Sequence, residues 1–191
     1  MLKDLITASR SYRSFDPNTR IPRDMLIDFV DCARLAPSSI NLQMLKFRIV
    51  DTQQECDAIL ANTRWAGKIK DCVIPPHGHA PVAYIVICAD KLVTPKAEEF
   101  QKDVGICAQT IMLAAAEAGF GGCMIGNYQA EKLSQQLALP DHLVPQLVLA
   151  LGKPDEKVEI TDAAEDGSVT YYRENGIHYV QKRKLKDLIL L

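Results

Sequence analysis

Apolar residues along the chain follow two spacings, one typical of amphipathic helices and one typical of buried strands. The helical spacing predicts helices over residues 2–9, 22–36, 53–62, 104–118 and 133–137. The remaining apolar runs predict extended segments over residues 47–50, 82–89, 146–151 and 177–180. The run from Val82 to Ala89 is apolar throughout, as in a strand buried on both faces. Because helices and strands mix without strict alternation, the pattern predicts a three-layer α+β fold.

The length and charge of the chain narrow the classes of protein it can belong to. A chain of 191 residues is of single-domain size, and we expect one domain over residues 1–191. The formal net charge is −2 and only 6% of residues are aromatic, which argues against a nucleic-acid partner. The longest charge-free apolar stretch, Val104 to Ala116, is too short to span a membrane, so no membrane partner is expected either.

Six cysteines stand at positions 32, 56, 72, 88, 107 and 123, without a Cys-x-x-Cys pair. Several lie inside apolar runs, which indicates free and mostly buried thiols. The first residues show no pattern of a secretory signal peptide. Together these features predict a cytoplasmic protein, with a disulfide framework as the less favoured alternative.

The polar and charged stretch over residues 153–176 is unusually long for a connection inside a compact monomer. We expect an exposed excursion there. Two interpretations are open, a mobile lid and a C-terminal arm exchanged with a second subunit.

Several common catalytic motifs are absent from the sequence. It has no Walker-type phosphate loop and no Gly-x-Ser-x-Gly elbow, and its Gly119–Gly122 run ends a predicted helix, whereas a dinucleotide fingerprint opens one. His77 and His79 lie in a proline-rich loop without further ligands at metal-binding spacing. We therefore expect no metal site, and we assign no catalytic side chain.

A first candidate binding motif is Arg10-Ser11-Tyr12-Arg13-Ser14-Phe15. In an extended segment, Ser11 and Arg13 share one side, and Arg10 stands where the first helix ends. Two guanidinium groups and a hydroxyl this close together can surround a phosphate with charge-assisted donors. The alternative is structural, with Arg10 at a helix C-terminus and Arg13 in solvent.

A second candidate is the loop Ala36-Pro37-Ser38-Ser39-Ile40-Asn41-Leu42-Gln43. The amides of Asn41 and Gln43 both donate and accept, which suits a heterocycle edge such as the flavin pyrimidine ring. A capping or turn cluster is the alternative reading of these polar residues.

These two motifs, with two others in the same order, resemble the FMN-dependent nitroreductase family. Asp103-Val104-Gly105, Gln109 and the run from Leu113 to Gly126 are similar to that family's central helix and following loop. Lys182-Arg183-Lys184-Leu185 is similar to its C-terminal basic motif. The chain departs from the family where Met44-Leu45 replaces a common Pro-Trp pair, which affects an aromatic contact near the flavin.

The resemblance implies a fold and a site. The fold is a three-layer αβα nitroreductase-like domain with a mixed central sheet, and its C-terminal arm is exchanged in a homodimer. The FMN phosphate would be held by Arg10, Ser11 and Arg13, with Lys182 and Arg183 approaching from the C-terminal arm. Asn41 and Gln43 would bond the flavin ring, Met124, Ile125 and Gly126 would line its reactive edge, and Pro37, Ser38 and Ser39 would contact it from the partner subunit. Structural alternatives remain for two of these groups, core packing for Met124 and Ile125 and a solvated tail for Lys182 and Arg183.

The resemblance also implies an activity, a cytoplasmic NAD(P)H oxidoreductase that reduces nitroaromatics, quinones or a related small acceptor by two electrons with ping-pong kinetics. FMN would be the resident cofactor and NADH or NADPH a transient co-substrate. Two alternatives keep the flavin. One is a different redox reaction on the same fold, such as dehalogenation, azoline oxidation or flavin fragmentation, and the other is non-catalytic flavin binding.

Overall fold

The computed structural model describes residues 1–65 and 73–190 and forms two compact units, residues 1–154 and 155–191. Each unit is described by itself. Of the positions singled out in the sequence, Cys72 lies outside the described residues. None of the helices in the described parts of the chain combines the length and the apolar character that crossing a membrane requires.

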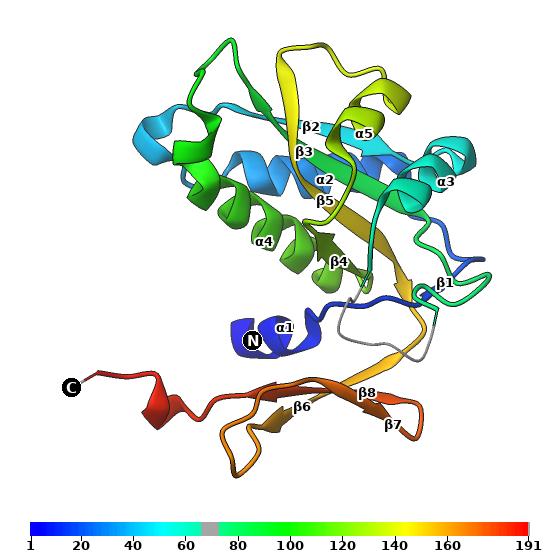
Figure 1. Ribbon diagram of the computed structural model, residues 1–191, viewed down its shortest axis with the longest axis vertical. Helices are drawn as coiled ribbons and strands as arrows, with labels where there is room; N and C mark the ends of the chain where they lie inside the picture. The colour runs from blue at the N-terminus through cyan, green and yellow to red at the C-terminus, as the bar shows by residue number, and fades with distance from the viewer. Residues whose placement is uncertain (66–72, 191) are drawn as a thin grey trace. The chain divides into compact units, whose positions relative to one another are not determined.

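The first unit is built on an antiparallel sheet (Figure 1). Its strands are β1 (Phe15–Asp16), β2 (Leu45–Val50), β3 (Ala83–Asp90), β4 (Gly121–Ile125) and β5 (Leu143–Pro154). The strand order is β1-β5-β3-β2, and β4 also pairs with β5. The family resemblance implies a mixed sheet, and the one parallel pair of strands among the described residues lies in the second unit.

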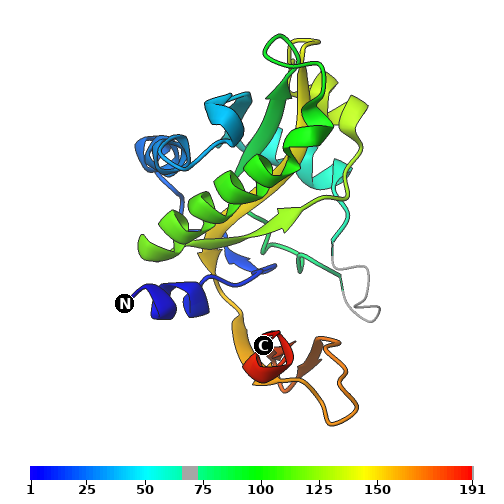
Figure 2. The same cartoon turned by 90° about the vertical axis from the view of Figure 1, so that its left-hand side faces the viewer.

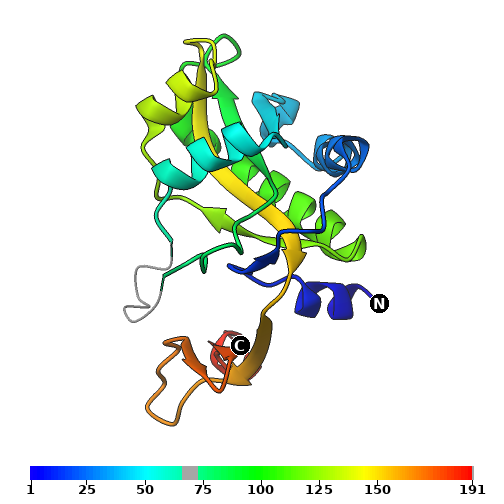
Figure 3. The same ribbon diagram turned by 90° about the vertical axis from the view of Figure 1, so that its right-hand side faces the viewer.

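Helices cover both faces of this sheet, which gives the three layers that the sequence predicts. The helices are α1 (Leu2–Ala8), α2 (Arg23–Arg34), α3 (Gln53–Asn62), α4 (Gln101–Glu117) and α5 (Ala130–Gln136), with 3-10 turns η1 (Ser39–Asn41) and η2 (Ala97–Phe100). In Figures 2 and 3, α2 and α4 lie on one side of the sheet and α3 and α5 on the other. Successive residues of β3 alternate between these layers, so that Ile85 and Ile87 pack with α2 and α4, whereas Tyr84 and Val86 pack with α3 and α5. This double cover explains why the strand is apolar at every position although its neighbours are antiparallel.

The end of α4 sets the position of β4. Gly119 adopts a left-handed φ of 78°, and the N–H groups of Gly119 and Phe120 donate to the carbonyls of Ala116 and Ala115 at 3.0 and 2.8 Å. This pattern is a Schellman motif, and it confirms the predicted helix end at Gly119. The chain then enters β4, a strand that the sequence analysis leaves as loop because it opens with two glycines.

The second unit contains the strands β6 (Lys157–Asp162), β7 (Tyr172–Glu174) and β8 (Ile177–Lys182), followed by the 3-10 turn η3 (Leu185–Asp187). They form a sheet in the order β6-β8-β7, with β6 and β8 parallel. The segment expected to be an exposed excursion, residues 153–176, contains the strands β6 and β7, whose residues are exposed or half-buried. Asn175 and Gly176 both have positive φ, which is the geometry of a tight hairpin turn. Across this hairpin the rings of Tyr172 and Tyr179 stack, with their centroids 5.0 Å apart.

Candidate functional site

A cavity of about 560 Å³ opens on the first unit beside the end of β4. Its lining residues are Arg13, Arg64, Trp65, Cys123, Met124, Ile125, Gly126 and Asn127. We call it the β4 cavity. It brings together Arg13 and the segment from Met124 to Gly126, which the sequence analysis selects from two motifs more than a hundred residues apart.

Two glycines allow the Arg10–Arg13 segment to lie against β4. Ser11 forms an isolated parallel bridge with Gly122, and the N–H of Tyr12 donates to the Gly122 carbonyl at 2.9 Å. A Cβ on Gly121 would stand 2.6 Å from the Tyr12 ring, and one on Gly122 would stand 2.0 Å from the carbonyl oxygen of Ala150. Side chains are therefore excluded at both positions, and this close approach places Arg13 on the cavity wall.

The side chain of Arg10 is only partly hydrogen-bonded within the described residues. Its Nη2 donates to the carbonyl of Ile6 at 2.7 Å, one turn back in α1, while its Nε is buried without a hydrogen-bond partner. A buried guanidinium N–H without an acceptor is costly, and an anionic oxygen would satisfy it. The residues present therefore fit a phosphate group at this position. Ser11, the hydroxyl of the predicted phosphate set, is exposed.

The end of β4 offers an open backbone surface. Met124 is 37% exposed in a strand whose other residues are buried, and a Cβ on Gly126 would meet no heavy atom within 4 Å. Packing inside the chain does not require glycine at position 126. Open space there leaves room for a flat ligand against the backbone, as the predicted ring contacts of Met124, Ile125 and Gly126 need.

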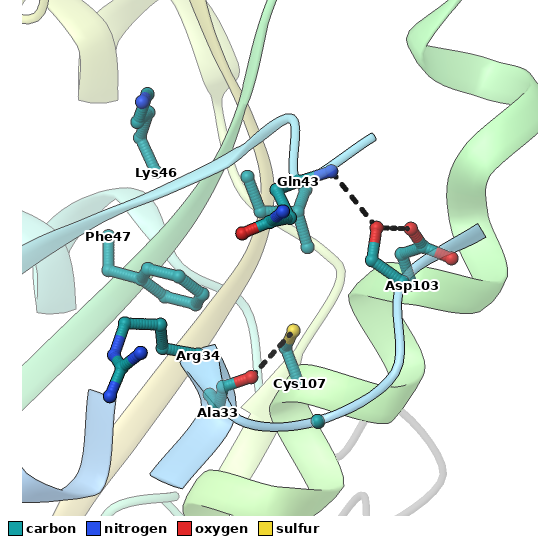
Figure 4. Close-up of a pocket in the computed structure, with 10 residues that line it drawn as sticks. Ala33, Arg34, Gln43, Lys46, Phe47, Asp103 and Cys107 are labelled. Carbon is teal, nitrogen blue, oxygen red and sulfur yellow. Dashed lines mark hydrogen bonds between the residues drawn. The ribbon is translucent and has the colours of Figure 1, made fainter. Parts of the chain in front are cut away.

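The predicted ring-binding loop forms a second cluster, around the first turn of α4 (Figure 4). The Asp103 carboxylate accepts hydrogen bonds from the Ser38 hydroxyl at 2.8 Å, the Ser39 hydroxyl at 2.5 Å and the Ser39 N–H at 2.9 Å. The N–H of Gln43 then donates to the Ser38 hydroxyl at 3.1 Å. Within its own chain, the two serines thus fasten the loop to α4.

A smaller cavity of about 220 Å³ lies under this loop. Its lining includes Ser38, Gln43 and Asp103, and Figure 4 shows Cys107 and Phe47 beneath them. We call Ser38, Gln43 and Asp103, together with Pro37, Ser39 and Asn41, the loop cluster.

The backbone of the loop is strained. Ile40, Asn41 and Gln43 have φ values of 48°, 55° and 53°, a left-handed conformation that non-glycine residues rarely adopt. Ile40 is nevertheless 87% exposed, so its own burial does not stabilise that conformation. Strain of this kind is concentrated at ligand-binding sites and is maintained by surrounding contacts, here the bonds to Asp103.

The electrostatics of Asp103 depend on those bonds. The residue is only 2% exposed, and burial alone would raise the pKa of its carboxyl. The hydrogen bonds from Ser39 and Ser38 outweigh this effect and lower the pKa below its ordinary value. Asp103 is therefore ionised at neutral pH and accepts all three bonds as a carboxylate.

The two clusters do not meet within one chain. The β4 cavity and the cavity under the loop share no lining residue. Figures 1 and 2 show η1 near the start of α4 and β4 near its end, and α4 has 17 residues, or about 25 Å of helix. Lys182, at the end of β8, and Arg183 are exposed and belong to the second unit, so their approach to the phosphate stays a prediction.

Four residues of the β4 cavity are not among those that the sequence motifs predict, namely Arg64, Trp65, Cys123 and Asn127. Arg64 and Trp65 follow α3, outside the predicted helices and strands, and they reach the cavity because the N–H of Arg64 donates to the carbonyl of Asn127 at 2.9 Å. A lone tryptophan beside an arginine in a loop is the one local signal that could have drawn attention to them. Among the described residues, no group of three or more His, Cys, Asp or Glu side chains could hold a metal.

Comparison with known proteins shows which proteins share these features. The model of the nitroreductase family matches residues 6–74 and 77–153. A protein of Methanothermobacter thermautotrophicus, named provisionally as an NADH dehydrogenase/NAD(P)H nitroreductase, is 26% identical over 157 residues, covering 80% of this chain and 77% of that protein.

Solved structures agree on the fold. The FMN-dependent nitroreductase of Clostridium difficile R20291 is 25% identical, with a TM-score of 0.64 over 80% of this chain and 87% of its own. A nitroreductase family protein of Streptococcus pneumoniae has a TM-score of 0.69 at 16% identity, over 91% of this chain and 100% of its own, and this likeness shows the fold alone.

The three-layer α+β fold and the family match define the chain as a flavin-dependent oxidoreductase. The chain belongs to the nitroreductase family, with FMN as its cofactor and NAD(P)H as its electron donor. Residues 155–191 lie outside the matched part of the chain.

Proposed function

We propose that this chain is a cytoplasmic, homodimeric enzyme that transfers two electrons from NAD(P)H to nitroaromatics, quinones or a related small acceptor. The observation that carries the proposal is the β4 cavity, where Arg13 and the open backbone at Gly126 lie on one wall. The buried, unpartnered Nε of Arg10 supports an anion site at the segment that contains Arg10 and Arg13.

In this proposal each group has a separate task. Arg10, Ser11 and Arg13 hold the FMN phosphate, while Met124, Ile125 and Gly126 support the ring from its edge. FMN, when bound, accepts a hydride from the nicotinamide and passes two electrons to the acceptor. The protein's residues hold the ring, leave one face open and provide positive charge for the reduced state. With a nitro acceptor, each turnover oxidises one NAD(P)H, consumes one proton and yields a nitroso product and water.

The separation of the two clusters supports a dimer. Pro37, Ser38, Ser39, Asn41 and Gln43 lie at the opposite end of α4 from the β4 cavity, so the loop cluster of one chain would complete the cavity of a second copy. Asp103 keeps this loop in its strained conformation, ready for that contact. We propose that Lys182 and Arg183 reach the same phosphate from the C-terminal unit.

The test is a visible spectrum of the purified protein, repeated after NADH and then NADPH are added under argon. We expect a yellow protein that is bleached within seconds and reoxidised by an added quinone or nitroaromatic. Protein that stays colourless after incubation with FMN would overturn the proposal. Bleaching by dithionite alone would indicate a different flavin reaction.

Light scattering during size-exclusion chromatography tests the dimer separately. We expect twice the chain mass of 21.2 kDa. A monomeric mass in a protein that retains FMN would contradict the shared site, because one chain would then hold the flavin without the loop cluster of a partner.

A further inference from the structure

Arg64 and Trp65 form a wall of the β4 cavity that the proposed function does not use. Both residues follow α3 and are fixed by pairing between residues 62–65 and 127–129. Thr63 forms an isolated antiparallel bridge with Tyr128, and the N–H of Gln129 donates to the Asn62 carbonyl at 3.1 Å. The backbone contacts at residues 62–64 therefore hold this part of the cavity wall in place up to Arg64.

The guanidinium group of Arg64 is available to a ligand. Its side chain is exposed and makes no hydrogen bond or ion pair with any described residue. The described lining of the cavity contains two arginines and no carboxylate. If Arg13 serves the flavin phosphate, Arg64 is a second positive charge without an anion of its own.

Trp65 adds a flat apolar surface next to that charge. Its indole Nε1 donates to the Thr63 hydroxyl at 3.0 Å, and that hydroxyl in turn donates to the Leu60 carbonyl at 3.1 Å. The indole N–H is thus already engaged within the chain, and what the ring offers a ligand is its apolar surface. Trp65 also lines a neighbouring cavity of about 350 Å³ with Pro75, Pro76 and His77.

We propose that the β4 cavity selects planar aromatic acceptors that carry a carboxylate, and that Arg64 recognises this carboxylate. The aromatic ring would lie between Trp65 and the flavin, and the guanidinium would bind the anion in a bidentate manner. This inference rests on the proposed function, because it places the flavin in the same cavity. It names the class of acceptor that the proposed function leaves open.

Two acceptors of nearly equal shape test the proposal, 4-nitrobenzoate and its neutral analogue 4-nitrobenzamide. In the protein as purified, Arg64→Gln should lower the ratio of their kcat/KM values by about tenfold, through loss of a charge-assisted bond to the carboxylate. Arg64→Lys should keep part of this preference. Lys91→Gln is the matched control, since it removes one exposed positive charge at the far end of β3, and it should leave the ratio unchanged.

Calorimetric titration of the oxidised protein with 4-nitrobenzoate gives a readout that needs no turnover. We expect Arg64→Gln to weaken this binding by about tenfold, with FMN content unchanged. If Arg64→Gln leaves the ratio of the two kcat/KM values unchanged, for example by lowering both equally, the role of Arg64 is overturned. Binding that depends on Arg64 in a protein that NAD(P)H does not bleach would overturn the proposed function, and with it the role of the bound molecule as an acceptor, while the carboxylate contact of Arg64 would still stand.

Discussion

Ser39 donates to the Asp103 carboxylate through both its backbone N–H, at 2.9 Å, and its hydroxyl, at 2.5 Å. The two residues are separated by 64 positions in the sequence. Their contact joins the strained loop after α2 to the first turn of α4, and it does so with a carboxylate that is nearly inaccessible to solvent. The loop conformation thus depends on one ionised side chain in another element.

Replacing Asp103 by Asn should therefore release the loop. The amide retains one acceptor oxygen, but its NH2 group replaces the other and faces one of the two serine hydroxyls donor to donor, and we expect a loss of about 2 kcal/mol in the free energy of unfolding. The affinity for FMN should fall at least tenfold, because the proposed partner contacts lie on this loop. Urea unfolding and FMN titration measure the two effects, with the exposed Asp141→Asn as control.

The same substitution should change the pH dependence of stability. Since the pKa of Asp103 is lowered in the folded protein, its contribution is complete above the ordinary carboxyl pKa and is lost as the pH falls through the folded value. The difference in Tm between wild type and Asp103→Asn should be constant near pH 7 and shrink below about pH 4. A difference that stays constant at low pH would show that the charge of Asp103 is not what holds the loop.

Replacing Arg10 and Arg13 together by Ala should remove FMN and leave a folded protein. Both residues lie in the segment between α1 and β1, and neither belongs to the buried core. We expect flavin absorbance at purification to fall to near zero while the circular dichroism spectrum is unchanged. Lys91→Ala should retain its flavin. Normal flavin content in the double variant would mean that the phosphate is held elsewhere.

Local patterns were sufficient to predict most elements of the first unit but not the contacts between them. The helix predicted over residues 53–62 is α3 with the same bounds, since its apolar residues Cys56 and Ile59 face the core at helical spacing. The strand predicted over residues 82–89 is β3, displaced by one residue. In contrast, β4 was missed because Gly121 and Gly122 have low strand propensity, and their role appears only when Tyr12 and Ala150 are placed beside them.

In the candidate site, too, local motifs identify some residues, whereas others reach the site only through tertiary contacts. Arg13 and Gly126 were selected from motifs, and the structure places both on one cavity. Arg64 and Trp65 were not, because they reach that cavity through pairing with residues 127–129, a contact that no local spacing encodes. The hydrogen bonds of Ser38 and Ser39 to Asp103 are likewise tertiary, so the sequence could identify the serines as polar loop residues but not their partner.

Substitution by Ala should lower the stability of the fold at Gly122, whereas at Gly126 it should weaken FMN binding with little effect on stability. A Cβ at position 122 would stand 2.0 Å from a backbone oxygen, so the strands must separate, and we expect a loss of about 3 kcal/mol in unfolding free energy. A Cβ at position 126 enters open space, and Gly126→Ala should unfold within about 0.5 kcal/mol of wild type. Its affinity for FMN should nevertheless fall several-fold. Unchanged FMN affinity in Gly126→Ala would argue against a flavin ring close to this backbone.

The thiols of Cys56 and Cys88 should be unreactive in the native protein. Both lie in the core between the sheet and the α3–α5 layer, and burial raises the pKa of each to about 12. At pH 8 the fraction of each thiol that is present as the reactive thiolate is therefore roughly 1,000-fold lower than for a thiol of pKa 9. Iodoacetamide at pH 8, followed by peptide mass spectrometry, should therefore leave both residues unlabelled in the native protein and label them fully in urea. Since the folded pKa lies far above the working pH, only about 0.1% of either thiol is ionised even at pH 9, and labelling of the native protein should stay slow. Rapid labelling of Cys88 in the folded protein would contradict the three-layer packing, because that residue lies in the central strand with helices over both faces of the sheet.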